Sequence, residues 1–134
     1  MVCACSALQP AGKDLCVAAE KGELDTVRTF LDDGAPMEWS NSGGQTPLHR
    51  ASSNGHHEVV ALLGSRGANA NAKDVHERTA LHFAAENGHP AVCTALLSLG
   101  TDPGAKDKYR ETALCKAEEE YETECVALLE AAME

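Results

Sequence analysis

The chain has 134 residues, a formal net charge of −10 and 43% apolar residues, which fits one globular unit or a short repeat array. The acidic balance argues against nucleic acid as a partner, because phosphate binding needs a basic surface. No stretch reaches the roughly 20 apolar residues of a membrane span. The first residues lack the basic and apolar regions of a secretory signal, so we expect a protein of the reducing cytoplasm or nucleus.

Residues 1–12 precede the first regular pattern, and we expect them to form an N-terminal tail. Cys3 and Cys5 stand close together in this segment. A tetrahedral metal site needs two further ligands at suitable spacing, and none is local. We therefore predict that this tail holds no metal site.

From residue 13 onward the sequence repeats itself every 33 residues. Three threonines, each followed by an apolar stripe at helical spacing, mark the repeat: Thr46, Thr79 and Thr112. A threonine hydroxyl caps a helix by accepting a backbone N–H of the first turn. Gly55 and Gly88 then end the first helix of their repeats, because glycine accepts the left-handed conformation found at helix ends. Each repeat is predicted to be a helix, a tight turn and a second helix.

These residues resemble the ankyrin-repeat family, whose 33-residue repeat carries the pattern Thr-Pro-Leu-His-x-Ala. The pattern stands at residues 46–51 and, with one change, at residues 79–84. The resemblance covers residues 13–134. It implies an all-α ankyrin-repeat solenoid of four helix-turn-helix repeats, residues 13–45, 46–78, 79–111 and 112–134, joined by short β-hairpin-like fingers. Carboxylates at Glu118 and Glu130 replace apolar residues of the sister repeats, so we expect capped ends and a complete array.

Two irregular positions predict local defects. Gly64 stands where the sister repeats carry Leu31 and Leu97, which predicts a packing gap in the second repeat. Tyr121 takes the place of a turn glycine, which leaves open whether the last repeat is two helices or one bent helix.

No residue pattern indicates catalysis. His49 and His82 share a repeat phase at which the family uses histidine to tie a helix start to neighbouring backbone. Glycine-rich phosphate loops, nucleophile triads and paired carboxylates are missing from the sequence. We therefore expect neither an enzyme nor a cofactor or metal site.

Four of the six cysteines occupy repeat phases that elsewhere hold buried histidine or valine: Cys16, Cys93, Cys115 and Cys125. Unpaired cysteine behaves as a small buried hydrophobic residue. We therefore predict free thiols and no native disulfide.

The resemblance implies a protein-binding surface, since the finger tips and the exposed sides of the first helices line a concave face in ankyrin arrays. Aromatic residues and arginine are over-represented at binding hot spots, and several fall at these phases. The candidate partner-binding residues are Trp39, Arg50, Asn54, Val75, His76, Phe83, Asn87, Lys108, Tyr109 and Arg110. A simpler interpretation of Trp39 is that it covers the first finger.

Short members of this family often regulate or inhibit a partner by covering its surface. The sequence therefore predicts a small, non-catalytic regulator or inhibitor that is a monomer when free and binds a protein. The alternative is a constitutive subunit or assembly chaperone of a larger protein complex.

Overall fold

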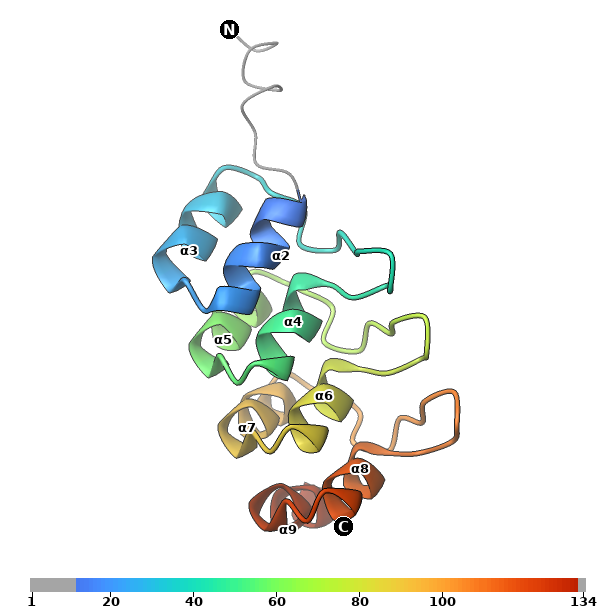
Figure 1. Cartoon of the computed structure of the whole chain (residues 1–134). Coiled ribbons are helices and arrows are strands. Elements are labelled where there is room, and N and C mark those ends of the chain that lie inside the picture. Colours follow the sequence, from blue (N-terminus) through green and yellow to red (C-terminus); the bar gives the residue numbers. More distant parts are fainter. Residues whose placement is uncertain (1–11, 133–134) are drawn as a thin grey trace, which may run out of the picture.

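The computed structural model describes residues 12–132, and the expectations for the tail and for Cys3 and Cys5 lie outside this range. Within it the chain forms eight helices and no strand (Figure 1). The helices are α2 (Gly12–Lys21), α3 (Leu24–Asp32), α4 (Pro47–Ser53), α5 (His57–Ser65), α6 (Ala80–Glu86), α7 (Pro90–Ser98), α8 (Ala113–Glu119) and α9 (Thr123–Ala132). The all-α architecture expected from the sequence is confirmed.

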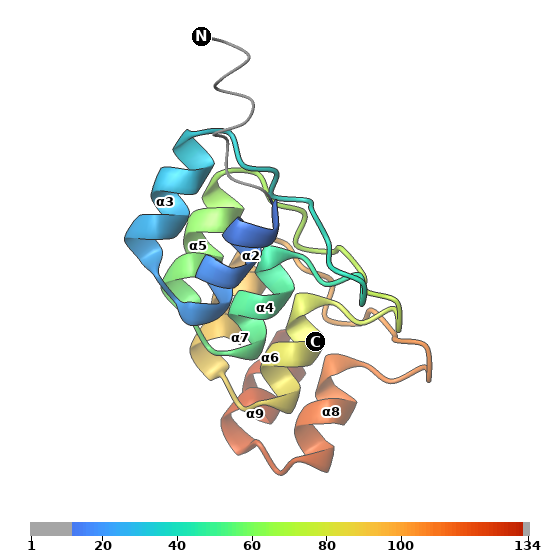
Figure 2. The ribbon, with the colours of Figure 1, turned by 45° about the horizontal axis from the view of Figure 1, so that its top comes forward.

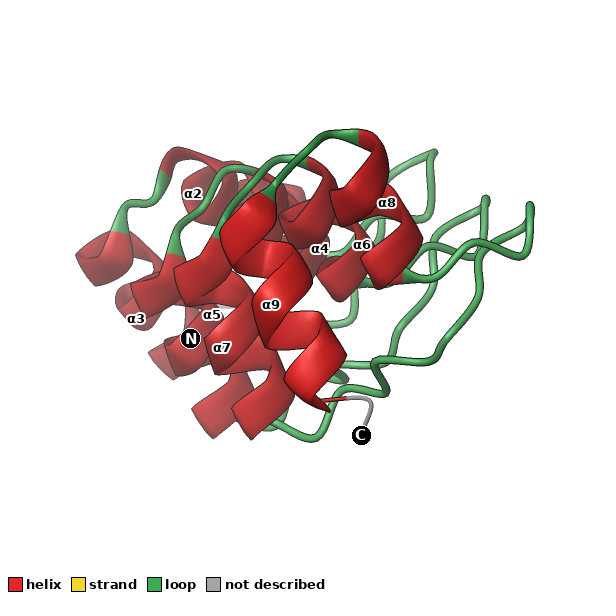
Figure 3. Cartoon of the chain, turned by 90° about the horizontal axis from the view of Figure 1, so that it is seen from below, coloured by secondary structure: helices red, strands yellow, loops and turns green. Residues whose placement is uncertain are grey.

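The helices form four antiparallel pairs that stack in two rows. The inner row contains α2, α4, α6 and α8, and the outer row contains α3, α5, α7 and α9 (Figures 1 and 2). Three long loops connect one pair to the next, and all three project to the same side, away from the outer row (Figure 3). The inner row and the loops therefore share one face, which we call the inner face.

Local hydrogen bonds explain where the inner helices begin. Thr46 Oγ1 accepts the backbone N–H of His49 at 3.3 Å, and Nδ1 of His49 accepts the N–H of Thr46 at 3.0 Å. Thr112 Oγ1 accepts the N–H of Cys115 in the same way at 3.3 Å. Each cap satisfies a backbone donor that the helix itself leaves unpaired.

The inner helices end in left-handed turns. Gly55 and Gly88 have φ values of 78° and 72°, and Tyr121 adopts φ 58° at the equivalent position. The last repeat is therefore two helices and not one bent helix, because Tyr121 takes the glycine conformation between α8 and α9. A side chain in this conformation is strained by roughly 1 kcal/mol or more.

Small and branched apolar residues fill the space between the two rows. Leu63, Leu96 and Leu129 stand at one repeat phase of the outer row, and all three are fully buried. Truncating such a leucine to alanine costs about 2–5 kcal/mol. Ala51 and Ala84 are also fully buried, and their small side chains allow neighbouring inner helices to approach closely.

The packing gap expected at Gly64 does not exist. A Cβ at this position would overlap the methyl groups of Leu99 and lie 3.0 Å from its Cγ. Leu99 stands at a different repeat phase, where the preceding repeat has Arg66. Its apolar side chain reaches back over α5 and fills the space that the sister repeats fill with leucine.

The four cysteines of the described range carry free thiols. Cys16, Cys93 and Cys125 are buried, whereas Cys115 is partly exposed. The Sγ atoms of Cys93 and Cys125 lie 4.0 Å apart across the contact between α7 and α9. None of the helices in residues 12–132 is both long and apolar enough to cross a membrane.

Candidate functional site: a pocket between two loop tips

The three long loops end in tips built on one plan, residues 41–45, 74–78 and 107–111. Each tip turns around Oδ1 of its first residue, which is Asn41, Asp74 or Asp107. This oxygen accepts backbone hydrogen bonds of 2.8–3.0 Å from the residues two and four positions later. The N–H of the first residue also donates to the carbonyl of the fifth at 2.9–3.0 Å. The N–H of the fourth residue donates to the carbonyl of the first at 2.9–3.0 Å, so every tip is a closed turn held by four hydrogen bonds.

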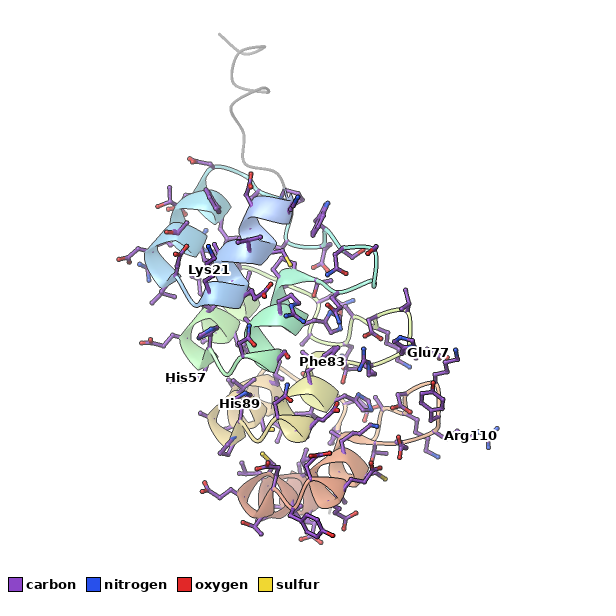
Figure 4. The ribbon with its side chains drawn as sticks, viewed as in Figure 1. Lys21, His57, Glu77, Phe83, His89 and Arg110 are labelled. Carbon is purple, nitrogen blue, oxygen red and sulfur yellow. The ribbon has the colours of Figure 1, made fainter. Side chains whose placement is uncertain are left out.

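The tips are aligned by hydrogen bonds from one to the next. The N–H of Val75 donates to the carbonyl of Gly43 at 3.1 Å, and the N–H of Lys108 donates to the carbonyl of His76 at 2.9 Å. Figure 4 shows Glu77 and Arg110 at the outer ends of the second and third loops. The tips thus form one continuous edge of the inner face.

A pocket of about 220 Å³ lies on the inner face between the second and third tips. Both tips, α6 and α8 contribute to its wall. The lining residues are His76, Arg78, Glu86, Asp107, Tyr109 and Lys116. Its wall therefore combines charged groups of both signs with one aromatic ring.

On the second tip, partly exposed Arg78 pairs with a buried carboxylate. Its Nε and Nη2 atoms lie 3.1 and 3.0 Å from the same oxygen, Oδ2 of Asp74, whose side chain is fully buried. The guanidinium carbon also lies 4.5 Å from the centroid of the Phe83 ring. The second tip therefore satisfies both oxygens of its aspartate, Oδ1 with backbone donors and Oδ2 with arginine.

On the third tip the equivalent pair is missing. Glu111 stands at the phase of Arg78 and pairs with Lys116 at 2.8 Å. Oδ2 of Asp107 is left buried without a hydrogen-bond partner. The Lys116 ammonium holds the pKa of Glu111 below its usual value, and Glu111 raises the pKa of Lys116 and of the neighbouring Glu119.

The two repeat-phase histidines hold the second and third loops in place. Nε2 of His49 donates to the carbonyls of Ala72 and Arg78 at 3.0 and 3.1 Å, and Nε2 of His82 donates to the carbonyl of Glu111 at 2.8 Å. Burial lowers the pKa of both histidines. The structural role expected for them is confirmed.

Two predicted binding residues are engaged within the chain. The side-chain amide of Asn54 donates to the carbonyl of Glu20 at 2.9 Å, and that of Asn87 donates to the carbonyl of Ser53 at 3.0 Å. These amides bind the ends of preceding inner helices, which sequence spacing alone does not reveal. Their first role is to join neighbouring helix pairs.

The interpretation of Phe83 as an accessible binding residue is wrong, and Trp39 is partly covered by the chain itself. Phe83 is only 6% exposed, because Arg78 covers it and the ring of His49 meets it edge-on at 5.5 Å. Trp39 is half-buried and packs over Gly12 at the start of α2. Neither ring is a freely accessible anchor.

The remaining candidates are better placed for binding. Val75 and Tyr109 are 58% and 67% exposed on adjacent tips, and the other exposed tip candidates are His76, Lys108 and Arg110. Arg50 is partly exposed and pairs with Glu20 at 3.3 Å. The ten candidates omit four residues that line the pocket: Arg78, Glu86, Asp107 and Lys116. The change from arginine at 78 to glutamate at 111 is the sequence signal that could have revealed them.

The carboxylates, guanidinium, ammonium and exposed ring of this pocket are groups suited to noncovalent recognition. Within residues 12–132, no group of three or more histidine, cysteine, aspartate or glutamate side chains is arranged to hold a metal ion.

Stacked helix pairs whose loops are tied together along one side define a helical repeat array. Residues 15–107 match a family model described as ankyrin repeats in three copies, and the chain belongs to the ankyrin-repeat family. Ankyrin repeats are protein–protein interaction modules, and the family is generally a non-catalytic interaction fold.

Several curated proteins are similar to parts of the chain. An ankyrin repeat-containing protein of Schizosaccharomyces pombe is 34% identical over 61 residues, covering 46% of this chain and 30% of that protein. Mouse GA-binding protein subunit beta-2 is 38% identical over 69 residues, covering 50% and 16%. Myotrophin of Xenopus tropicalis is 38% identical over 57 residues, covering 42% and 48%. The chain therefore matches less than half the length of each of these relatives.

Proposed function

We propose that the chain is a non-catalytic binding protein, a small regulator or inhibitor that covers a partner's surface with its inner face, which is concave. We place it in the cytoplasm or the nucleus. The observation that carries this proposal is the pocket between the second and third tips, with exposed Val75 and Tyr109 on those two tips. Apolar and aromatic side chains beside a polar pocket are typical of an interface core with a polar rim.

Preorganisation of the tips supports the same proposal. His49 and His82 fix the ends of the second and third tips, and Asp74 and Asp107 hold the tip backbone. A surface that is already ordered loses little conformational entropy when a partner binds, and more of the contact energy then appears as affinity. Rigid tips with exposed side chains are therefore suited to specific recognition.

The test begins with an affinity pull-down and mass spectrometry to identify the partner. Tyr109→Ala is then titrated against that partner, and we expect a loss of about 1–3 kcal/mol of binding free energy, as is usual for truncation of a hot-spot residue. Because Tyr109 is 67% exposed, the substitution should leave the fold unchanged, and circular dichroism checks this. Matched controls on the outer row are Arg28→Ala and Thr94→Ala, both at exposed positions.

If the control variants lose affinity and Tyr109→Ala does not, the partner binds the outer row and not the inner face.

Co-purification separates the two roles that the sequence leaves open. A regulator is found partly free, whereas a constitutive subunit or assembly chaperone is always recovered with its complex.

A further inference from the structure

We propose, on the basis of the binding function above, that the pocket between the second and third tips receives an arginine side chain of the partner protein. The guanidinium of this arginine pairs with Oδ2 of Asp107. The pocket is thus a specificity site for a basic residue, and the rest of the inner face supplies surrounding contacts.

The second tip provides the template for this pair. Arg78 directs two nitrogen atoms at Oδ2 of Asp74, at 3.1 and 3.0 Å. The first tip has a neutral version, in which the side-chain amide of Asn41 donates to Oε1 of Gln45 at 3.3 Å. In both tips, the side chain of the first residue forms a hydrogen bond with the side chain of the residue four positions later.

The third tip lacks this internal partner. Glu111 is four residues after Asp107, and a carboxylate cannot donate a hydrogen bond to another carboxylate. Asp107 is 5% exposed, and its Oδ2 atom is buried without a partner. A buried carboxylate oxygen without a donor is unfavourable, so an external donor that reaches it gains a strong, charge-assisted hydrogen bond.

The charge around the pocket selects a cation. Three carboxylates lie close enough to Lys116 to raise its pKa, Glu111 foremost, followed by Glu119 and Glu86. The two carboxylates that line the pocket, Glu86 and Asp107, form no ion pair within the described residues. The two cationic side chains of the wall, Arg78 and Lys116, are each already paired with another carboxylate. The unpaired charge of the wall is therefore negative, which attracts a positively charged side chain.

The geometry favours arginine over lysine. A guanidinium presents neighbouring N–H groups in a planar fork, which is how Arg78 places two donors on one oxygen. Tyr109 supplies an exposed ring in the pocket wall over which a guanidinium can stack. Because Oδ2 of Asp107 is covered in the free protein, the arginine can reach it only if neighbouring side chains move aside.

The direct test is a nuclear magnetic resonance titration of the ¹⁵N-labelled full chain with N-acetyl-arginine methylamide. The control probe is N-acetyl-citrulline methylamide, which has a similar shape and no charge. We expect saturable shifts of the Tyr109 and Glu111 amide signals with the arginine probe, because both N–H groups bind Asp107 Oδ1. The citrulline probe should give no saturable shift.

Two variants make the test specific. Asp107→Asn keeps the tip, since Asn41 forms the same two backbone hydrogen bonds in the first tip. It should weaken the arginine probe by about tenfold or more, because it removes a charge-assisted hydrogen bond. Glu111→Arg supplies an internal guanidinium, as in the second tip, and should also abolish binding. The matched control is Asp102→Asn. Asp102 is an exposed turn aspartate that accepts the N–H of Gly104, and the variant protein should bind the probe as the wild type does.

Equal shifts from both probes, or full binding by Asp107→Asn, would overturn the proposal. The titration of Tyr109→Ala against the natural partner separates this failure from that of the proposed function. If Tyr109→Ala weakens the partner and the arginine probe shows no dependence on Asp107, the arginine pocket is wrong and the binding face stands. If the probe binds as expected and Tyr109→Ala leaves the partner unaffected, the inner face is not the partner's site.

Discussion

Gly64 on α5 faces the side chain of Leu99 at the end of α7, and a Cβ at Gly64 would overlap the leucine methyl groups. The glycine therefore permits close approach of two neighbouring helix pairs. This contact reverses the effect that the sequence alone suggests for a larger residue at position 64.

Gly64→Leu is expected to lower the free energy of unfolding by about 1–3 kcal/mol, the usual cost of overpacking. The gain in helix propensity of about 1 kcal/mol offsets only part of this cost. Urea unfolding measures the change. In a Leu99→Ala background the same substitution should cost much less, because the space is then available. An equal loss in both backgrounds would show that Leu99 is not the obstacle.

The error at Gly64 shows what repeat comparison misses. Aligning Gly64 with Leu31 and Leu97 reveals the missing side chain. It does not reveal Leu99, because this residue belongs to another phase of the following repeat. Phase comparison predicts which positions are buried, whereas the identity of the neighbour that fills a space depends on packing between repeats.

Tyr121 has the conformation of a glycine, with φ 58°, and its side chain is 87% exposed. Tyr121→Gly should raise the free energy of unfolding by about 1 kcal/mol, because strain is removed and little packing is lost. Tyr121→Ala is the matched control. It retains the Cβ that causes the strain and should give no comparable gain. Thermal and urea unfolding of the three proteins decide the point.

Phe83 belongs to the interior, and its truncation is a test of stability. Phe83→Ala should destabilise the fold by about 3 kcal/mol, since it opens a cavity beneath the Arg78 guanidinium. Tyr109→Ala serves as the exposed aromatic control and should leave the unfolding midpoint nearly unchanged. Equal midpoints for the two variants would contradict the burial of Phe83.

The buried thiols are expected to remain reduced and to react slowly. Burial raises the pKa of Cys93 and of Cys125, so neither forms the reactive thiolate readily. In the native protein, alkylation should modify partly exposed Cys115 before Cys93 or Cys125. Alkylation of the freshly prepared unfolded chain, with and without reductant, should give one mass. A two-dalton deficit per bridge before reduction would reveal a disulfide, with Cys93 and Cys125 the nearest described pair.

The candidate site was predictable where it depends on repeat phase. Val75, His76 and Tyr109 occupy tip positions, and the structure places them on exposed tips. The repeat pattern also assigns Asn54 and Phe83 to the inner row, but their side-chain contacts come from other repeats and are not encoded in local spacing. The pocket itself depends on which charges pair, a property of three-dimensional arrangement.

The pH dependence of stability follows from His49 and His82. Burial lowers the pKa of both from the ordinary value of 6.5. As the pH falls through 6.5, these histidines bind protons in the unfolded chain while they stay neutral in the folded one. Protons therefore favour unfolding. The contribution of the two neutral histidines to the free energy of unfolding is complete above pH 6.5. It is lost as the pH falls toward their lowered pKa values in the folded state.

Urea unfolding between pH 7.5 and 5 should thus show a constant free energy above pH 6.5 and a decline below it. With two histidines the slope cannot exceed about 2.7 kcal/mol per pH unit. The double variant His49→Cys with His82→Cys should flatten this decline, since cysteine at the same phase keeps the cap, as Cys115 does with Thr112. His57→Gln, at an exposed position, is the control and should retain the wild-type decline. A double variant with the wild-type slope would show that other groups control stability in this range.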